Sequence, residues 1–282
     1  MREGKFIRDI LGGSMDEAIK NKLVIIGGAE DKWGESHVLK HAIDLCGDES
    51  ARIVVLTTAT QKPQEVGEEY RNVFSRLGVG SIDILNINNR IEANDETVVQ
   101  RISNATGVFF TGGDQLRITS ILGGTKTNDA LKNLYNKGAP IIGTSAGASA
   151  MSSTMIVEGS GNAAARKCTL GMSPGLGFLN GVIIDQHFEQ RGRLGRLLIG
   201  VAQNPSVIGV GIDEDTAIIV NGNKSFDVVG TNCVTVVDGR NIDLSNVSEL
   251  APEEIIALSD IKLHVLPNGY GFDLKKMQVM KS

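Results

Sequence analysis

The stretch APIIGTSAGASAM, residues 139–151, contains the sharpest pattern in the chain. An apolar run is followed by Gly143-Thr144-Ser145-Ala146-Gly147 and then by small residues that can open a helix. A G-x-S-x-G pentapeptide between a strand and a helix is the setting of a nucleophile elbow, in which a serine occupies a tight, strained turn. A glycine-rich turn whose serine has no catalytic role could have the same sequence, but the strand–turn–helix context favours the elbow.

Short apolar segments alternate with helical patterns around this stretch. The predicted strands are 22–26, 52–56, 81–87, 107–110 and 140–142, and the predicted helices are 36–45, 63–77, 96–104, 115–122 and 128–136. Strands that are apolar throughout and alternate with helices indicate a parallel sheet covered on both faces. The sequence therefore predicts an α/β fold with a doubly wound, mostly parallel sheet and helices on both faces.

The rhythm changes after about residue 205, where short strands follow one another closely. They are predicted at 207–212, 217–220, 225–229, 233–237 and 261–266, with a further strand at 181–184 before them. Turn signals between them favour antiparallel strands, which the C-terminal part of the chain would add to the same sheet. We expect a single α/β catalytic domain over 22–282, preceded by an N-terminal extension over 1–21.

Composition excludes several classes of protein. The 282 residues carry a formal net charge of −5, and only 4% of them are aromatic, which makes nucleic-acid binding unfavourable. The apolar runs are too short to span a membrane, and the N-terminus does not resemble a signal peptide. Cys46, Cys168 and Cys233 are scattered without a CxxC spacing, which favours a reducing compartment. We expect a cytoplasmic protein without a membrane partner.

A serine nucleophile needs a base, and the chain has four histidines. His37 and His41 share one face of a predicted helix with no evident third metal ligand, so a solvated face is the better interpretation. His264 lies in an apolar strand, where a structural role is the default. His187 follows the strand 181–184, and ligands bind at the carboxyl ends of strands in such sheets. His187 is therefore the predicted base.

The acid that would orient His187 has four candidates at strand ends: Asp185, Asp213, Glu214 and Asp215. Asp185 is only two residues from His187, which is awkward for reaching the far nitrogen of that ring. The other three form a cluster directly after the strand 207–212. The order serine, histidine, acid also differs from the serine, acid, histidine order of the α/β-hydrolases, so a standard lipase or esterase is disfavoured.

Other predicted strand ends carry residues that could take part in the same site. The backbone N–H groups of Gly113 and Ala146 are candidates for an oxyanion hole, and Gln115 can hydrogen-bond a substrate. The turn 27–30, Gly-Gly-Ala-Glu, is a weak phosphate-loop candidate that lacks the G-x-G-x-x-G spacing, so nucleotide binding is disfavoured. Guanidinium groups pair bidentately with carboxylates, so Arg191, Arg193 and Arg196 after His187 form either a solvated helix start or a clamp for an acidic substrate.

Five segments together resemble one known family. The matching segments, between about residues 22 and 240, are VIIGGAED (24–31), FFTGGDQL (109–116), GTSAGAS (143–149), DQHF (185–188) with Arg191, Arg193 and Arg196, and GIDEDTA (211–217). They are similar to those of cyanophycinase, a serine exopeptidase related to aspartyl dipeptidase (dipeptidase E). The resemblance implies a flavodoxin-like fold similar to that of the class I glutamine amidotransferases.

The resemblance also implies a substrate and roles. Cyanophycin is a poly-aspartate backbone with arginine attached to each side-chain carboxylate, and the family releases β-aspartyl-arginine dipeptides from its end. Ser145 would be the nucleophile, His187 the base and Glu214 the orienting acid. The implied substrate contacts are Gln115, Asp185, Gln186, Arg191, Arg193 and Arg196, with Asp185 meeting the guanidinium group of the substrate. A homodimer is implied, with no cofactor and no metal.

Three alternatives stay open at this point. One is a dipeptidase for α-aspartyl peptides, whose relatives are shorter. The second is a non-catalytic binding protein on the same fold, although Ser145, His187 and Glu214 are all present. The third is a nucleotide or flavin binder, for which the few aromatic residues offer little stacking surface.

Overall fold

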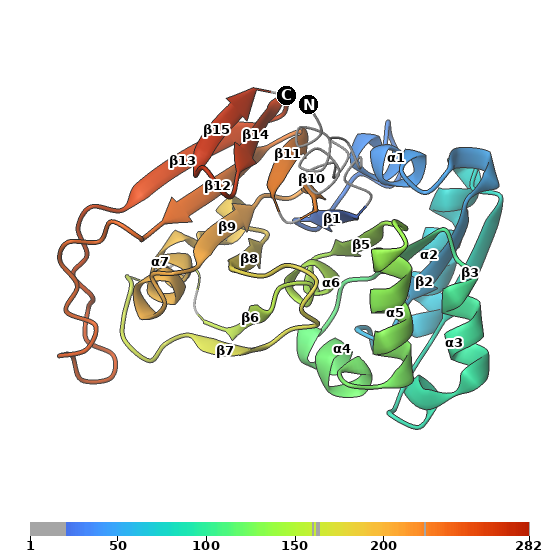
Figure 1. The fold of residues 1–282 in the computed structure, drawn as a ribbon, viewed down its shortest axis with the longest axis horizontal. Helices are drawn as coiled ribbons and strands as arrows, with labels where there is room; N and C mark the ends of the chain where they lie inside the picture. The colour runs from blue at the N-terminus through green and yellow to red at the C-terminus, as the bar shows by residue number, and fades with distance from the viewer. Residues whose placement is uncertain (1–20, 160, 162–163, 223, 282) are drawn as a thin grey trace, which may run out of the picture.

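The structure, a computed structural model, describes residues 21–159, 161, 164–222 and 224–281. The N-terminal extension expected over 1–21 lies, except for Asn21, outside the described residues. Figure 1 shows two neighbouring sheets, the larger one extending towards α2 and α3 and the smaller one lying beside α7.

Five parallel strands form one half of a nine-stranded sheet. Their order is β1 (Lys22–Ile26), β5 (Ile141–Thr144), β4 (Gly107–Phe110), β2 (Arg52–Leu56) and β3 (Ser81–Leu85). The first four of these strands are almost entirely buried because helices cover both of their faces, whereas in the edge strand β3 only Leu85 is buried.

Successive side chains of each strand point to opposite faces of the sheet, and each face packs against its own set of helices. Side chains two apart on β1, such as Val24 and Ile26, share a core with α1 (His37–Asp44) and α2 (Pro63–Arg76). Their neighbours Leu23 and Ile25 share a core with α3 (Glu96–Ser103), α4 (Gln115–Leu122) and α5 (Lys126–Asn136). The predicted doubly wound α/β fold is confirmed.

Local chemistry sets several of the helix starts. The side chains of Asp95, Asp114 and Thr125 each accept a hydrogen bond from a backbone N–H in the first turn of the helix that follows. Because Thr125 caps α5, that helix begins at Lys126, two residues before its predicted start. Pro63 occupies the first turn of α2, where its missing N–H costs nothing.

Four antiparallel strands complete the large sheet on the other side of β1. They are β10 (Thr216–Asn221), β11 (Ser225–Gly230), β14 (Tyr270–Asp273) and β15 (Gln278–Lys281). The prediction of added C-terminal antiparallel strands is confirmed for β10 and β11, whereas β14 and β15 were not predicted.

The predicted strands 207–212, 233–237 and 261–266 do not join the large sheet, which corrects the sequence-based expectation. They become β9 (Ile208–Ile212), β12 (Cys233–Asp238) and β13 (Lys262–Pro267) of a four-stranded sheet whose fourth member is β8 (Val182–Gln186). Strand β9 runs parallel to β8 because the helix α7 (Leu194–Gln203) makes the crossover between them.

The two sheets share one hydrophobic core. Ile184 of β8 and Val210 of β9 belong to the same buried cluster as Ile25 of β1 and Ile218 of β10. The opposite side of the small sheet packs on α7 and on the hairpin of β6 (Thr154–Glu158) and β7 (Gly171–Pro174). In the described part of the chain no helix has the length and apolar character needed to cross a membrane.

Candidate active site

Ser145 lies between β5 and the four-residue helix α6 (Ala146–Ser149). Its backbone φ of 53° is positive, a strained conformation for a residue with a side chain. The Ser145 N–H donates to the carbonyl of Ile26 at the end of β1, at 3.1 Å. The turn has the geometry of the predicted nucleophile elbow, and its hydroxyl points toward the second sheet.

His187 follows β8 and meets the serine from the other sheet. Its Nε2 lies 3.0 Å from the Ser145 Oγ, and its Nδ1 lies 2.6 Å from the Glu214 Oε1. A carboxylate only accepts, so Nδ1 carries the proton that it donates to Glu214, and Nε2 accepts from the Ser145 hydroxyl. The backbone N–H of His187 donates to the Gly27 carbonyl at 2.8 Å, which fixes the ring near the end of β1.

Glu214 lies in the three-residue link between β9 and β10, where the chain passes from one sheet to the other. Its backbone N–H donates to the Gln190 Oε1 at 3.0 Å. The flanking acids bind backbone N–H groups instead: Asp213 accepts from Glu189 and Cys233, and Asp215 accepts from Asp31. Of the three clustered acids, the structure therefore brings only Glu214 to the imidazole.

Ser145, His187 and Glu214 form a single hydrogen-bonded chain. In such a chain the serine proton can move to Nε2 as Oγ attacks a carbonyl carbon, while the carboxylate stabilises the imidazolium that results. The arrangement has the chemistry of a serine hydrolase.

Two glycines at the end of β1 let the sheets approach at this point. A Cβ on Gly27 would lie 2.0 Å from the Asp213 carbonyl oxygen, and one on Gly28 would lie 2.4 Å from His187 Cε1 and Nε2. Gly28 also has a φ of +101°, which side chains rarely adopt. This glycine-rich turn was only a weak phosphate-loop candidate because it lacks the G-x-G-x-x-G spacing, and in the structure the His187 ring covers the space beside Gly28.

We expect Gly28→Ala to displace the imidazole and to lower kcat/KM by about 100-fold or more, because small misplacements of a catalytic group are costly. Gly181→Ala is the matched control, since Gly181 has a φ of +71° and a Cβ added to it would meet no atom within 4 Å. Both variants introduce strain of about 1–2 kcal/mol, so both should melt at a lower temperature. Equal activity losses in the two would contradict the role of Gly28.

Burial lowers the pKa of His187 from its ordinary value of 6.5, Glu214 acts to raise it, and the charge of Arg191 lowers it. The neutral ring is the form that accepts a proton, so activity is present above this pKa and is lost as the pH falls through it. We expect the acid limb of the kcat/KM profile to have its midpoint below 6.5.

Removing the Arg191 charge should raise the pKa of His187. We therefore expect Arg191→Met to move the acid limb to higher pH, while Arg166→Met leaves it in place, because Arg166 binds the Glu253 carbonyl elsewhere. A limb that stays fixed or moves to lower pH in Arg191→Met would contradict this electrostatic coupling.

The turn after β4 lies against the serine. A Cβ on Gly112 would be 3.3 Å from the Ser145 Cβ, which places the Gly112-Gly113 backbone beside the elbow. Gly113 is exposed, and Ala146 is the first residue of α6. The half-buried Gln115 donates through Nε2 to the Ile156 carbonyl at 2.9 Å. Gly113 and Ala146 thus belong to the two backbone segments beside Ser145, and their role as oxyanion donors stays a prediction.

The predicted substrate residues at the end of β8 and in the turn and helix after it bind mainly one another. Asp185 has no exposed surface, and its carboxylate accepts from Arg196 Nε at 2.7 Å and from Arg193 Nη1 at 3.4 Å. Gln186 accepts from Arg193 at 3.0 Å through Oε1. Burial lowers the pKa of Arg193 to about 10, so the group remains charged at neutral pH.

This network bears on the expected role of Asp185. Its carboxylate is fully buried and paired with Arg196 and Arg193, and its contact with the guanidinium of a substrate stays a prediction. In this structure Asp185 anchors the two arginines, and Arg191 is the exposed member of the cluster. The anchor was not predicted from the sequence because the i, i+8 and i, i+11 pairs form across the strand–helix turn.

The comparison with family models agrees with this geometry. Residues 23–228 match the model of peptidase family S51. The chain belongs to peptidase family S51. The match includes Ser145, His187 and Glu214, so this S51 peptidase carries its hydrogen-bonded triad wholly inside the family region.

Curated relatives of this S51 peptidase cover nearly all of its length. A cyanophycinase from Geminocystis herdmanii is 33% identical over 267 residues, which are 94% of this chain and 98% of the relative. A cyanophycinase from Synechococcus elongatus is 35% identical over 92% of this chain and 81% of the relative. A cyanophycinase from a Nostoc strain is 33% identical over 94% and 89%, respectively.

Solved structures show the same fold at lower identity. A peptidase from an acI-B1 Actinobacterium has a TM-score of 0.66 at 20% identity and covers 90% of this chain and 97% of its own. A putative peptidase E protein from Listeria monocytogenes has a TM-score of 0.54 at 14% identity, over 75% and 99% of the two chains.

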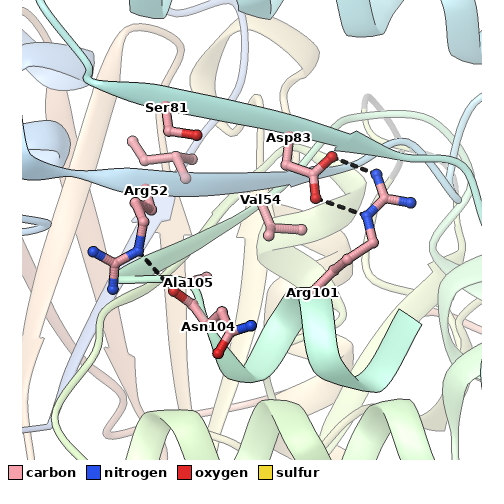
Figure 2. A pocket seen from close by; sticks show the side chains of 8 residues that line it. Arg52, Val54, Ser81, Asp83, Arg101, Asn104 and Ala105 are labelled. Carbon is pink, nitrogen blue, oxygen red and sulfur yellow. Dashed lines mark hydrogen bonds and ion pairs between the residues drawn. The ribbon is translucent and has the colours of Figure 1, made fainter. Parts of the chain in front are cut away.

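Other sites on this S51 peptidase offer less chemistry. A pocket of about 240 Å³ lies at the amino ends of β2 and β3 (Figure 2). Ser145 instead follows the carboxyl end of the parallel strand β5. In the pocket Arg101 pairs with Asp83, and Arg52 donates to the Asn104 carbonyl, so no nucleophile faces a base. Across the described residues, no three His, Cys, Asp or Glu side chains are grouped to hold a metal ion.

Proposed function

We propose that this S51 peptidase is a serine exopeptidase that degrades cyanophycin and releases β-aspartyl-arginine dipeptides. The observation that carries the proposal is the hydrogen-bonded chain from Ser145 through His187 to Glu214. The curated relatives named cyanophycinase support the substrate, because they are 33–35% identical over more than nine-tenths of this chain.

In the proposed reaction, Ser145 Oγ attacks a main-chain carbonyl carbon of the polymer as His187 Nε2 takes its proton. The backbone N–H groups of Gly113 and Ala146 stabilise the tetrahedral oxyanion. His187 then gives the proton to the departing amine, which leaves an acyl-enzyme on Ser145. Water, deprotonated by the same nitrogen, releases the acyl group. Glu214 keeps Nδ1 protonated and stabilises the imidazolium at each step.

We propose that substrate carboxylates bind the arginine cluster. Arg191 is exposed and within electrostatic reach of His187, so it can approach an anionic group beside the scissile bond. Gln115 and Gln186 supply polar contacts to the substrate at the same site. Asp185 acts indirectly by holding Arg193 and Arg196 in place. The charge of the cluster favours a substrate that carries a carboxylate on every repeat.

The test is incubation of the purified protein with insoluble cyanophycin, followed by clearing and by mass analysis of the soluble products. Ser145→Ala runs beside the wild type, and one arm contains a chelator. We expect β-aspartyl-arginine from the wild type only, unaffected by chelation. If the polymer stays intact while α-aspartyl dipeptides are cleaved, the serine mechanism holds and the substrate proposal is wrong. If neither is cleaved, a binding protein becomes the better interpretation.

The homodimer and the cytoplasmic compartment are part of the same proposal. The dimer follows from the family resemblance, and the compartment follows from the scattered, unpaired cysteines. Light scattering after size-exclusion chromatography should give a mass near twice the chain mass of 30.0 kDa. A mass of one chain at micromolar concentration would contradict the dimer.

A further inference from the structure

Glu30 places a carboxylate in the protein interior directly behind the elbow. Its side chain is only 5% exposed, although a buried carboxylate is costly unless its oxygens are hydrogen-bonded. Two hydroxyls meet this need: Tyr70 donates to Oε1 at 2.5 Å, and Thr144 donates to Oε2 at 2.6 Å. Neither partner is a cation, so a simple ion pair does not explain the position of this carboxylate.

Thr144 links this carboxylate to the elbow. It is the last residue of β5, it is 2% exposed, and Ser145 follows it in the strained conformation. The elbow is therefore tied at two successive residues to the end of β1 and to the turn after it. Ser145 binds Ile26 of β1 through its N–H, and Thr144 binds Glu30 of the turn through its side chain. Strained backbone of this kind persists only where the surrounding structure fixes it.

The same turn also contacts His187 and the residue that follows Glu214. The Gly27 carbonyl accepts from the His187 N–H, and the Gly28 carbonyl accepts from the N–H of Asp215, the residue after Glu214. Glu30 lies two residues beyond Gly28, so a shift of its carboxylate would change the spacing between Ser145 and the His187 ring.

We propose that Glu30 is a positioning residue: through Thr144, and supported by Tyr70, it holds Ser145 Oγ at hydrogen-bonding distance from His187 Nε2. The inference rests on the serine mechanism proposed above and adds a fourth side chain to it. Glu30 touches no substrate atom and acts only through the geometry of the elbow.

Thr144→Val tests this role with little change of shape, because valine keeps the volume of threonine and loses only the hydroxyl. The readout is the rate at which a fluorophosphonate modifies Ser145. This rate is divided by the amount of Ser145 that the reagent has modified when the reaction is complete, which gives a rate per titrated serine. We expect this rate and kcat to fall by about 10- to 100-fold, with KM within about twofold of the wild type, since misplacement affects the reacting atoms and not substrate contacts. Glu30→Gln and Tyr70→Phe should also lower the rate at which Ser145 is modified.

Two controls separate positioning from folding. Thr144→Ser keeps the hydroxyl and should restore the rate to within about twofold of the wild type. Thr57→Val removes a comparable buried hydroxyl directly after β2, which donates to the carbonyl of Leu85 at the end of β3. This variant should leave the rate per titrated serine unchanged. Thermal melts of all variants measure the cost to stability.

The inference is overturned if Thr144→Val melts earlier but each titrated serine reacts at the wild-type rate, because the contact is then only structural. It is also overturned if Thr57→Val slows the reaction as much as Thr144→Val. A wild-type protein that does not react with the fluorophosphonate would instead reject the serine mechanism itself, so the two failures are distinguishable.

Discussion

Replacing Ser145 with alanine is expected to lower kcat by about a million-fold, the effect that removal of the nucleophile has in other serine peptidases. The loss should be this large because the hydroxyl 3.0 Å from His187 is the one nucleophile that the elbow presents to this imidazole. Binding should survive, since the substitution removes one small atom and leaves the arginine cluster intact. The measurement is release of β-aspartyl-arginine together with co-sedimentation of the variant with the polymer.

Ser152→Ala is the matched control for this variant. Ser152 is also a buried serine near the elbow, but its hydroxyl donates to the Ser149 carbonyl, so we expect activity within about threefold of the wild type. If Ser145→Ala retained more than about one-hundredth of the wild-type rate, a nucleophile other than Ser145 would have to be sought.

Glu214→Gln should lower kcat by about ten-thousand-fold, with KM nearly unchanged, as in other triads in which an amide replaces the acid. The amide has nearly the same shape as the carboxylate, but it is neutral and can donate to the imidazole, which favours the wrong tautomer. The imidazolium formed during acylation then lacks the negative charge that now lies 2.6 Å from Nδ1. Steady-state kinetics on the polymer and on a short aspartyl substrate measure the effect.

The neighbouring acids provide two controls in the same loop. Asp213→Asn and Asp215→Asn weaken hydrogen bonds to backbone N–H groups, so both should lower the melting temperature and reduce kcat by less than about tenfold. A loss of activity in Asp213→Asn that equals the loss in Glu214→Gln would refute the assignment of the acid to Glu214.

The parallel half of the fold could be predicted because each of its strands is an apolar run flanked by amphipathic helices. The partition of the C-terminal strands between two sheets could not, because β9 and β10 are both short, apolar and only three residues apart. Which sheet each strand joins depends on its partner, β8 or β1, and those partners are distant in the sequence. The short strands β14 and β15 carry too few apolar residues to stand out.

Ser145 and His187 were accessible from the sequence because one has a recognisable turn and the other follows a strand end. Glu214 was not distinguishable from Asp213 and Asp215 by residue type, and only the family resemblance singled it out. The pairing of Asp185 with Arg196 also needed the structure, since burial and such a contact are tertiary properties. The contact of Glu30 with Thr144 joins residues 114 apart, and no local pattern signals it.

The division of the active site between two sheets has a consequence for protein synthesis. A ribosome completes the segment with Ser145 before the residues that supply its base and its acid, and those residues reach the serine only after β8 and β9 have paired and docked. A partly made or partly folded chain therefore holds an unactivated hydroxyl. We expect such a chain to be inactive until both sheets have folded and docked.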